Sequence, residues 1–341
     1  MSLVNYLGQT DTIKNLNQQA TAQSAQLLLG VNGTARAASI AAMFKVQPRQ
    51  MLVITDTQAH AEQLYSDLTS LVGDAVYHFP AEESVATEMA ISSPELRRQR
   101  VQTLIALLAN QPMLVVTNLT GIEQLLPAPM TLREAQLKVH VGQNYNLNQI
   151  KNTLMMMGYT PVKLVQTPGE FAQRGSIMDI YPLTLEDPIR LDFFDDELDQ
   201  LKSFDVATQK SIQTLDEMAI EPATDFVVSE ANYDRAKLAI ETAFSQYRSQ
   251  LQGVEKKHAT DGFNLTQHVL NERQRGSELL PYAKHFFDGQ ITIFDYLNDD
   301  ALIVLDEYTR ITETSLQQLT RDQEWIDNQT TSYQLLPNQT W

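Results

Sequence analysis

The sequence predicts an α/β fold in which a domain with a parallel sheet is interrupted by a smaller α+β domain. Two continuous apolar runs, MLVIT at 51–55 and MLVVT at 113–117, alternate with helical patterns, as the covered strands of a parallel sheet do. Later, apolar and polar residues alternate one by one between glycines and prolines, which is typical of an antiparallel sheet. We expect residues 1–128 to begin the larger domain, 129–212 to form the inserted domain and 213–341 to complete the larger one.

Helical and strand patterns alternate through the first part of the chain. QLLL at 26–29 is expected to be a short strand ending at Gly30, and a helical pattern follows over 37–44. Residues 59–73 predict a second helix, which a glycine closes because glycine readily adopts the left-handed conformation found at helix ends. A longer helix is expected over 94–109, before the second apolar strand.

The remaining elements are read from the same periodicities. The inserted domain follows the proline-rich LPAPM at 126–130 and includes a short helix over 148–157. Apolar residues then recur every three or four positions from Tyr233 to Leu251, which predicts a long helix. ITIFDYL at 291–297 and ALIVLDE at 301–307 are expected to add strands to the parallel sheet.

Residues 30–37 have the layout of a phosphate-binding loop without its working residues. Such a loop reads G-x-x-x-x-G-K-[ST]: backbone amides wrap the phosphates, the lysine neutralises them and the hydroxyl binds magnesium. Counted from Gly30, the last three positions hold Ala35, Arg36 and Ala37. A guanidinium does not replace a compact ammonium, and alanine cannot bind a metal. Alternatively, Gly30 and Gly33 are only turn residues before an ordinary helix.

A second fragment supports the interpretation of a decayed nucleotide site. ALIVLDE ends in Asp306 and Glu307, the layout of an apolar strand followed by the acids that hold magnesium and activate water in helicase-type ATPases. Together the two fragments predict a RecA-like domain, derived from a P-loop NTPase, that has lost its ATPase activity. We expect neither a cofactor nor a metal.

Composition excludes several other classes of protein. The chain has no cysteine, which excludes disulfides, thiolate metal sites and cysteine catalysis. Its histidines show no zinc-ligand spacing, and no serine lies in a G-x-S-x-G elbow. With 42 acidic and 25 basic residues, the net charge of −17 disfavours general binding to duplex DNA. No membrane span or signal peptide is evident, so we expect a cytoplasmic protein without a membrane partner.

The stretch Gly169–Ile212 carries the most specific motifs of the chain. It combines E-F-x-x-R-G, D-I-Y-P and F-F-D-D-E-x-D with a trailing F-D-x-x-T-Q. This combination resembles the inserted domain shared by bacterial transcription-repair coupling factor and the excision-repair subunit UvrB. Coupling factor is the more similar, because UvrB carries a working G-K-T loop and a tyrosine-rich hairpin. After Val76–Pro80 this chain instead reads AEESVATEMA.

The resemblance implies recruitment rather than catalysis. In this family the inserted domain binds UvrA, whereas the ATP-driven DNA translocase and the RNA-polymerase-binding domain lie further along the protein. The chain is therefore expected to be an N-terminal piece, which meets RNA polymerase and DNA through the rest of the protein. In some members the protein's own C-terminal domain masks the UvrA-binding surface. These roles carry over to Glu170, Phe171, Gln173 and Arg174 within E-F-x-x-R-G.

Two further residues bear on the predicted UvrA-binding surface, and two of its residues have an alternative structural role. Thr160 stands where relatives often have arginine, and Lys163 could supply the missing charge of the UvrA-binding surface. Arg174 could instead be a structural arginine that pairs with the acidic run within 192–199. Phe171 could equally be a core residue, because it lies on a strand with alternating faces.

Two other functions compete with a docking scaffold. The chain could be an active ATP-dependent helicase or excision-repair subunit, which would require nucleotide binding at Gly30–Ala37 despite the missing lysine and hydroxyl. It could also bind damaged DNA, against which the net charge of −17 argues.

Overall fold

The computed structural model describes residues 3–20, 24–81, 94–273 and 277–337. These residues divide into two compact units, the first within Met1–Glu88, Thr103–Gln124 and Thr292–Gln323, the second within Met89–Gln102, Leu125–Ile291 and Glu324–Trp341. The stretch after residue 81, where the sequence reads AEESVATEMA in place of a tyrosine-rich hairpin, lies largely outside the described residues.

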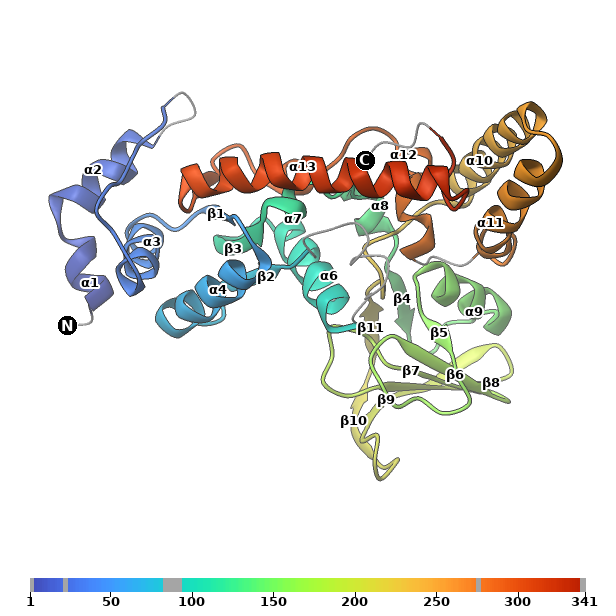
Figure 1. Ribbon diagram of the computed structural model, residues 1–341. Helices are drawn as coiled ribbons and strands as arrows, with labels where there is room; N and C mark the ends of the chain where they lie inside the picture. Colours follow the sequence, from blue (N-terminus) through green and yellow to red (C-terminus); the bar gives the residue numbers. More distant parts are fainter. Residues whose placement is uncertain (1–2, 21–23, 82–93, 274–276, 338–341) are drawn as a thin grey trace. The chain divides into compact units, whose positions relative to one another are not determined.

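Helices and strands alternate along the first unit (Figure 1). Its elements are α1 (Leu3–Gly8), α2 (Asp11–Gln19), α3 (Thr34–Val46), β1 (Gln50–Thr55), α4 (Gln58–Val72), β2 (Val76–Phe79), β3 (Met113–Asn118), α7 (Leu119–Glu123), the 3-10 turn η2 (Ile293–Tyr296) and β12 (Leu302–Leu305). Two long helices, α6 (Pro94–Leu108) and α13 (Tyr308–Thr331), contribute residues to both units.

A parallel four-stranded sheet forms the centre of the first unit. Its strand order is β12-β1-β3-β2, and β1 pairs in parallel with both β12 and β3. Every residue of β1 and β3 is buried, which explains why both strands are continuously apolar rather than alternating. The predicted α/β class with a parallel sheet is therefore confirmed, as are three of the expected strands.

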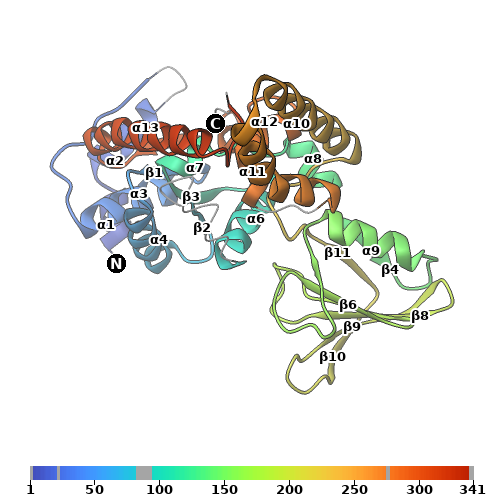
Figure 2. The same cartoon turned by 45° about the vertical axis from the view of Figure 1, so that its right-hand side comes forward.

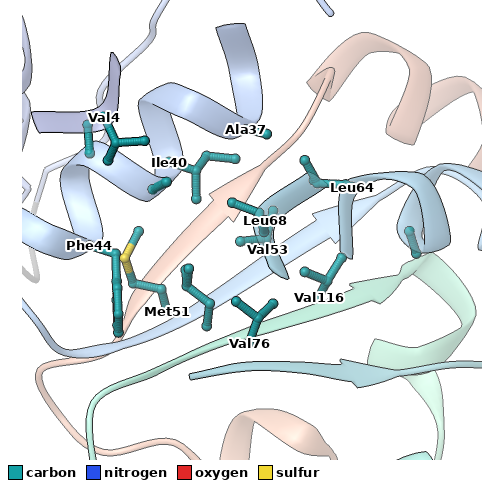
Figure 3. Packing of buried hydrophobic residues seen from close by; sticks show 14 of the residues in the cluster. Val4, Ala37, Ile40, Phe44, Met51, Val53, Leu64, Leu68, Val76 and Val116 are labelled. Carbon is teal, nitrogen blue, oxygen red and sulfur yellow. The ribbon is translucent and has the colours of Figure 1, made fainter. Parts of the chain in front are cut away.

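One face of this sheet is covered by helices that share a hydrophobic core with it. Figure 3 shows Ala37 and Ile40 of α3 and Leu68 of α4 packed near Val53 of β1 and Val116 of β3. Helices α1 and α2 add apolar side chains to the same cluster. Helix α4 ends where the sequence predicted, because Gly73 adopts a positive φ of 86° as its C-cap.

Two predicted strands of the larger domain are wrong. Residues 24–29, which include QLLL, belong to no strand, and Leu27 and Leu29 are exposed. The three leucines have no neighbouring strand to pair with the N–H and C=O groups of their backbone, so they form no strand. ITIFDYL contains the 3-10 turn η2 instead of a strand, because Thr292 and Asp295 form a reciprocal capping box that starts a helical turn.

In the second unit the strands all precede the long helices α10 and α11. Its elements are α8 (Pro129–Glu134), β4 (Leu137–His140), α9 (Leu147–Met156), β5 (Thr160–Pro161), β6 (Glu170–Arg174), β7 (Ile177–Ile180), β8 (Ile189–Phe194), β9 (Glu197–Phe204), β10 (Ser211–Leu215), β11 (Glu217–Ile220), α10 (Glu230–Gln250), α11 (Gly253–Asn271), η1 (Ser277–Tyr282) and α12 (Ala283–Phe286).

A six-stranded sheet in the order β10-β9-β8-β7-β6-β5 dominates the strand-rich part of this unit (Figure 2). Strands β6 to β10 pair antiparallel, as the alternating sequence predicted, and only the two-residue β5 pairs in parallel with β6. Strands β4 and β11 form a separate antiparallel pair. The sheet continues beyond residue 212, since β10 ends at Leu215.

The helices after the sheet form a core of their own. Helix α10 buries Tyr233, Ala236 and Ile240, as its three- and four-residue spacing predicted. Further along α10, Phe244 stacks on Phe263 of α11 with ring centroids 4.0 Å apart. Among the helices that the structure describes, none is long and apolar enough to cross a membrane.

Candidate docking face and degenerate nucleotide site

Strand pairing divides the predicted contact residues of β6 between the two faces of the sheet. Side chains alternate along a strand, so Glu170 and Arg174 share one face and Phe171 and Gln173 point to the other. Phe171 is only 1% exposed and packs inside the domain. Its ring is therefore a core residue in this structure, which is the alternative that the sequence left open. We call the face that carries Arg174 the outer face.

The outer face holds a pair of arginines that share one buried carboxylate. Asp179 of β7 is 1% exposed, and Arg174 Nη2 donates to its Oδ2 at 2.7 Å. Arg190 of β8 donates to the same carboxylate twice, from Nε at 2.6 Å and from Nη2 at 2.9 Å. The acid that Arg174 contacts is therefore Asp179, not a member of the acidic run after Leu191. The Arg174 side chain remains 50% exposed.

Two further contacts hold Arg190 in place. Its guanidinium carbon lies 4.4 Å from the centre of the Phe204 ring, and Nη2 also donates to Gln209 Oε1 at 3.0 Å. The hydrogen bond to Asp179 raises the pKa of Arg190 above its ordinary value. The guanidinium is therefore charged and fixed, while its side chain is 22% exposed.

An exposed aromatic residue lies at the end of β8. Phe194 is 75% exposed and precedes the two-residue turn of Asp195 and Asp196, in which Asp195 has a positive φ of 55°. Alternation along β8 places Phe194 on the same face as Arg190. Phe194 belongs to the F-F-D-D-E-x-D motif and Arg190 lies three residues before it, but the sequence did not single out either residue. The strict alternation in IRLDFF, with Ile189, Leu191 and Phe193 buried, is the signal that identifies them.

The other predicted contact residues differ in their exposure and in their hydrogen-bond partners. The Glu170 carboxylate accepts hydrogen bonds from the backbone N–H of Gln166 at 2.7 Å and of Thr167 at 2.9 Å, so it closes the loop before β6. Thr160 is exposed and pairs with Glu170 across β5 and β6. Lys163 and Gln173 are also exposed. Only Arg174 among the predicted residues combines exposure with a fixed charged group.

In the first unit, the two fragments of the predicted nucleotide site lie together. Gly30 and Gly33 both have positive φ, and α3 begins directly after Gly33. Arg36 Nη1 lies 2.6 Å from Glu307 Oε1 and 3.3 Å from Asp306 Oδ2. The arginine at the lysine position is thus bonded to the acids at the magnesium position. The sequence predicted both groups as remnants of one site, although it did not predict that they pair.

A second arginine completes this charge cluster. Arg310 Nε lies 3.2 Å from Oδ2 of Asp56, a buried carboxylate that follows β1, and Asp56 also contacts His60 Nδ1. Burial raises the pKa of Asp306, and the positive charge of Arg36 opposes this shift. In open α/β sheets, ligands bind at the carboxyl ends of the strands. Here the charges at the ends of β1 and β12 are paired with one another.

Two further positions of this loop carry no polar side chain. Ala37 is 1% exposed and belongs to the core between α3 and the sheet, while Ala35 is exposed and has no polar side chain. Among the residues that the structure describes, no group of three or more histidine or acidic side chains is arranged to hold a metal ion.

Comparison with known proteins agrees with the motifs within Gly169–Ile212. The family model described as UvrB interaction domain matches residues 137–226. The transcription-repair-coupling factor of Bacillus subtilis (strain 168) is 33% identical over 307 residues, which are 89% of this chain and 26% of that protein. The corresponding protein of Staphylococcus aureus (strain bovine RF122 / ET3-1) is 29% identical over 330 residues, or 96% of this chain and 28% of that protein.

The match therefore extends far beyond residues 137–226, yet this chain spans only about a quarter of the length of these relatives. The resemblance drawn from Gly169–Ile212 is confirmed. The chain contains a UvrB interaction domain and is related, along nearly its whole length, to part of the transcription-repair-coupling factors.

Proposed function

We propose that this chain is a non-catalytic, UvrB-like scaffold that docks the repair protein UvrA and so recruits it to stalled RNA polymerase. The outer face of the six-stranded sheet carries this proposal. It presents the half-exposed guanidinium of Arg174 and the exposed ring of Phe194 on rigid, paired strands. Arginine and aromatic residues are the types that contribute most binding energy at protein interfaces.

The rest of the parent protein would supply the remaining steps. Contacts with RNA polymerase and DNA, the ATP-driven motor and masking by a C-terminal domain are assigned to segments beyond this chain. The first unit is then a RecA-like domain that no longer turns over ATP, interrupted by the inserted domain. Its paired Arg36, Asp306 and Glu307 support this view, because a nucleotide with magnesium would have to break both ion pairs. We expect the protein to act in the cytoplasm.

Calorimetric titration of the whole chain with UvrA from the same organism tests the docking function. Binding at micromolar or tighter affinity is expected. Arg174→Ala and Phe194→Ala should each weaken it by roughly 30-fold, the equivalent of about 2 kcal/mol for an interface hot spot. Gln173→Ala, on the opposite face of β6, tests whether this other predicted residue takes part: a small change in affinity would confine the contact to the outer face. Absence of binding by the folded wild-type chain would refute the proposal.

Titration with ATP and magnesium tests the competing enzyme function. The wild-type chain is expected to show no binding and no hydrolysis. Tight nucleotide binding would instead identify an active ATPase, despite the arginine and alanines at positions 35–37.

A further inference from the structure

We infer that Arg36 is a built-in substitute for a nucleotide, which holds the turn between β12 and α13 in one conformation. This turn, called here the β12–α13 turn, consists of Asp306 and Glu307. In GTPases the terminal phosphate and its magnesium ion hold comparable loops, which are released after hydrolysis. The inference goes beyond the docking function, because the turn lies in the first unit and its role involves no contact with UvrA.

The first step is that the backbone of this turn needs to be held. Glu307 has a positive φ of 62°, a left-handed conformation that a residue with a Cβ rarely adopts. Its carbonyl accepts a hydrogen bond from Ile311 N–H at 3.1 Å, which closes the first turn of α13. On the other side, Asp306 N–H donates to the Ile54 carbonyl of β1 at 2.9 Å. The start of α13 therefore depends on a conformation that persists only where neighbouring groups favour it.

The second step is that two arginines hold the Glu307 carboxylate. Arg36, in the first turn of α3, donates from Nη1 to Oε1 at 2.6 Å, and Arg310 Nη1 lies 3.7 Å from Oε2. Arg36 Nη1 also lies 3.3 Å from Asp306 Oδ2, so one guanidinium contacts both residues of the turn. Arg310 pairs in addition with Asp56, which follows β1, at 3.2 Å. These ion pairs connect the β12–α13 turn to α3 and to the end of β1.

The third step is that Arg36 contributes more to this hold than Arg310 does. It reaches the turn from α3, and its planar guanidinium can bond more than one carboxylate oxygen. Arg310 lies three residues after Glu307 on the helix itself, and its contact with that carboxylate is longer. Arg36 also stands where a phosphate-binding loop has the lysine that neutralises the phosphates. The turn is thus held by a side chain of the chain itself, so it should not respond to ATP.

Hydrogen–deuterium exchange of the whole chain tests this inference, with mass spectrometry of the peptides that cover residues 305–316. Arg36→Ala should raise the exchange rate in the first turn of α13 about tenfold, because this turn then opens more often. Arg321→Ala is the matched control. Arg321 lies further along α13 and donates to the Gln317 carbonyl of the same helix, so its removal should leave these peptides unchanged.

Two substitutions of Glu307 distinguish the backbone conformation from the charge. Both remove the carboxylate, but glycine adopts a positive φ without strain and alanine does not. Glu307→Ala should therefore raise the exchange rate at least as much as Arg36→Ala does, whereas Glu307→Gly should raise it much less. In a chain that already carries Glu307→Gly, adding Arg36→Ala should have little further effect, because the strained conformation no longer needs to be held.

The outcomes separate this inference from the docking function. If Arg36→Ala leaves the exchange of residues 305–316 unchanged, the inference is wrong and the docking proposal stands. An equal rise throughout the first unit, or equal exchange in Glu307→Ala and Glu307→Gly, would also overturn it.

The wild-type chain supplies two tests that need no variant and remain decisive if Arg36→Ala fails to fold. The Arg36 and Glu307 side chains are 31% and 41% exposed, so added salt should weaken their ion pair and raise the exchange of residues 305–316. Exchange that stays constant with salt would refute the inference. ATP with magnesium should not alter the exchange, and protection of these peptides by ATP would overturn both this inference and the proposed loss of nucleotide turnover.

Discussion

Replacing Arg100 with alanine removes the guanidinium that is bonded to a buried carboxylate in the second unit. Arg100 Nε lies 2.7 Å from Asp225 Oδ2, and the two side chains are only 6% and 8% exposed. Burial opposes ionisation of Asp225, but Arg100, with help from Arg97, keeps the pKa of that carboxyl below its ordinary value. Removing one partner of a buried ion pair lowers the free energy of unfolding by about 3–5 kcal/mol. We expect a loss near the lower end of this range, because Arg97 remains and still attracts the Asp225 carboxylate.

Thermal unfolding monitored by calorimetry measures this effect. A loss of about 3 kcal/mol should lower the Tm of the second unit by about 6–12 °C. Arg98→Ala on the same helix is the matched control. Its partner Glu95 is exposed and 3.6 Å away, so its removal should cost no more than about 1 kcal/mol.

A double variant distinguishes the loss of the ion pair from the cost of leaving one buried charge without a partner. Arg100→Met together with Asp225→Leu removes both charges and should recover most of the stability, because apolar side chains of similar volume replace a buried pair at little cost. If Arg100→Ala alone costs less than the Arg98→Ala control, the pair is not buried as described and the reasoning fails.

The same ion pair predicts how stability depends on pH. The folded-state pKa of Asp225 is lowered, so the stabilisation is complete above the unfolded pKa of about 4 and is lost as the pH falls towards the lower, folded value. Denaturation by urea at pH values from neutral to about 3 should show this loss in the wild type and a smaller one in the double variant.

Three further substitutions test packing near the two sites. Phe171→Ala should lower the free energy of unfolding, measured with urea, by about 3–5 kcal/mol, because the ring is buried. Gln173→Ala on the same strand should hardly change it, because that side chain is exposed. Gly158→Ala should lower the Tm more than Gly142→Ala does. Both glycines have positive φ, but of the two only Gly158 would place a Cβ 2.7 Å from a neighbouring side chain, that of Thr224. Ala37→Thr, the change needed to restore a metal-binding hydroxyl, should cost about 1–3 kcal/mol in the same unfolding assay, because the site is packed.

Most helices and strands, and their order along the chain, could be predicted from the local pattern of apolar and polar residues. Continuous apolar runs identified β1 and β3, and one-by-one alternation identified the antiparallel strands, because burial on one or both faces leaves a direct imprint on the sequence. The apolar run of β12 also marked a strand, although Ile303 and Leu305 are exposed there rather than buried as expected. The same patterns failed at QLLL and ITIFDYL. An apolar run becomes a strand only if a neighbouring strand pairs with it, and a capping pair such as Thr292 and Asp295 can outweigh strand propensity.

The motifs located the UvrB interaction domain but could not decide which of its side chains are exposed. Phe171 and Arg174 are three residues apart on one strand, yet pairing between β6 and β7 buries the first and leaves the second half exposed. Arg174 bonds Asp179 of β7, and Arg190 of β8 bonds the same carboxylate, so this arrangement depends on the register of three strands.

The charge cluster around Arg36 also separates what the sequence determines from what the tertiary structure determines. The sequence alone determined that the lysine and hydroxyl of a phosphate-binding loop are absent, because that is a matter of residue identity. Only the tertiary structure decided that Arg36 bonds Asp306 and Glu307, some 270 residues later. The parallel pairing of β12 with β1 positions those acids. An ion pair depends on a few ångströms of separation, and such distances follow from the pairing of remote segments rather than from either segment's own pattern.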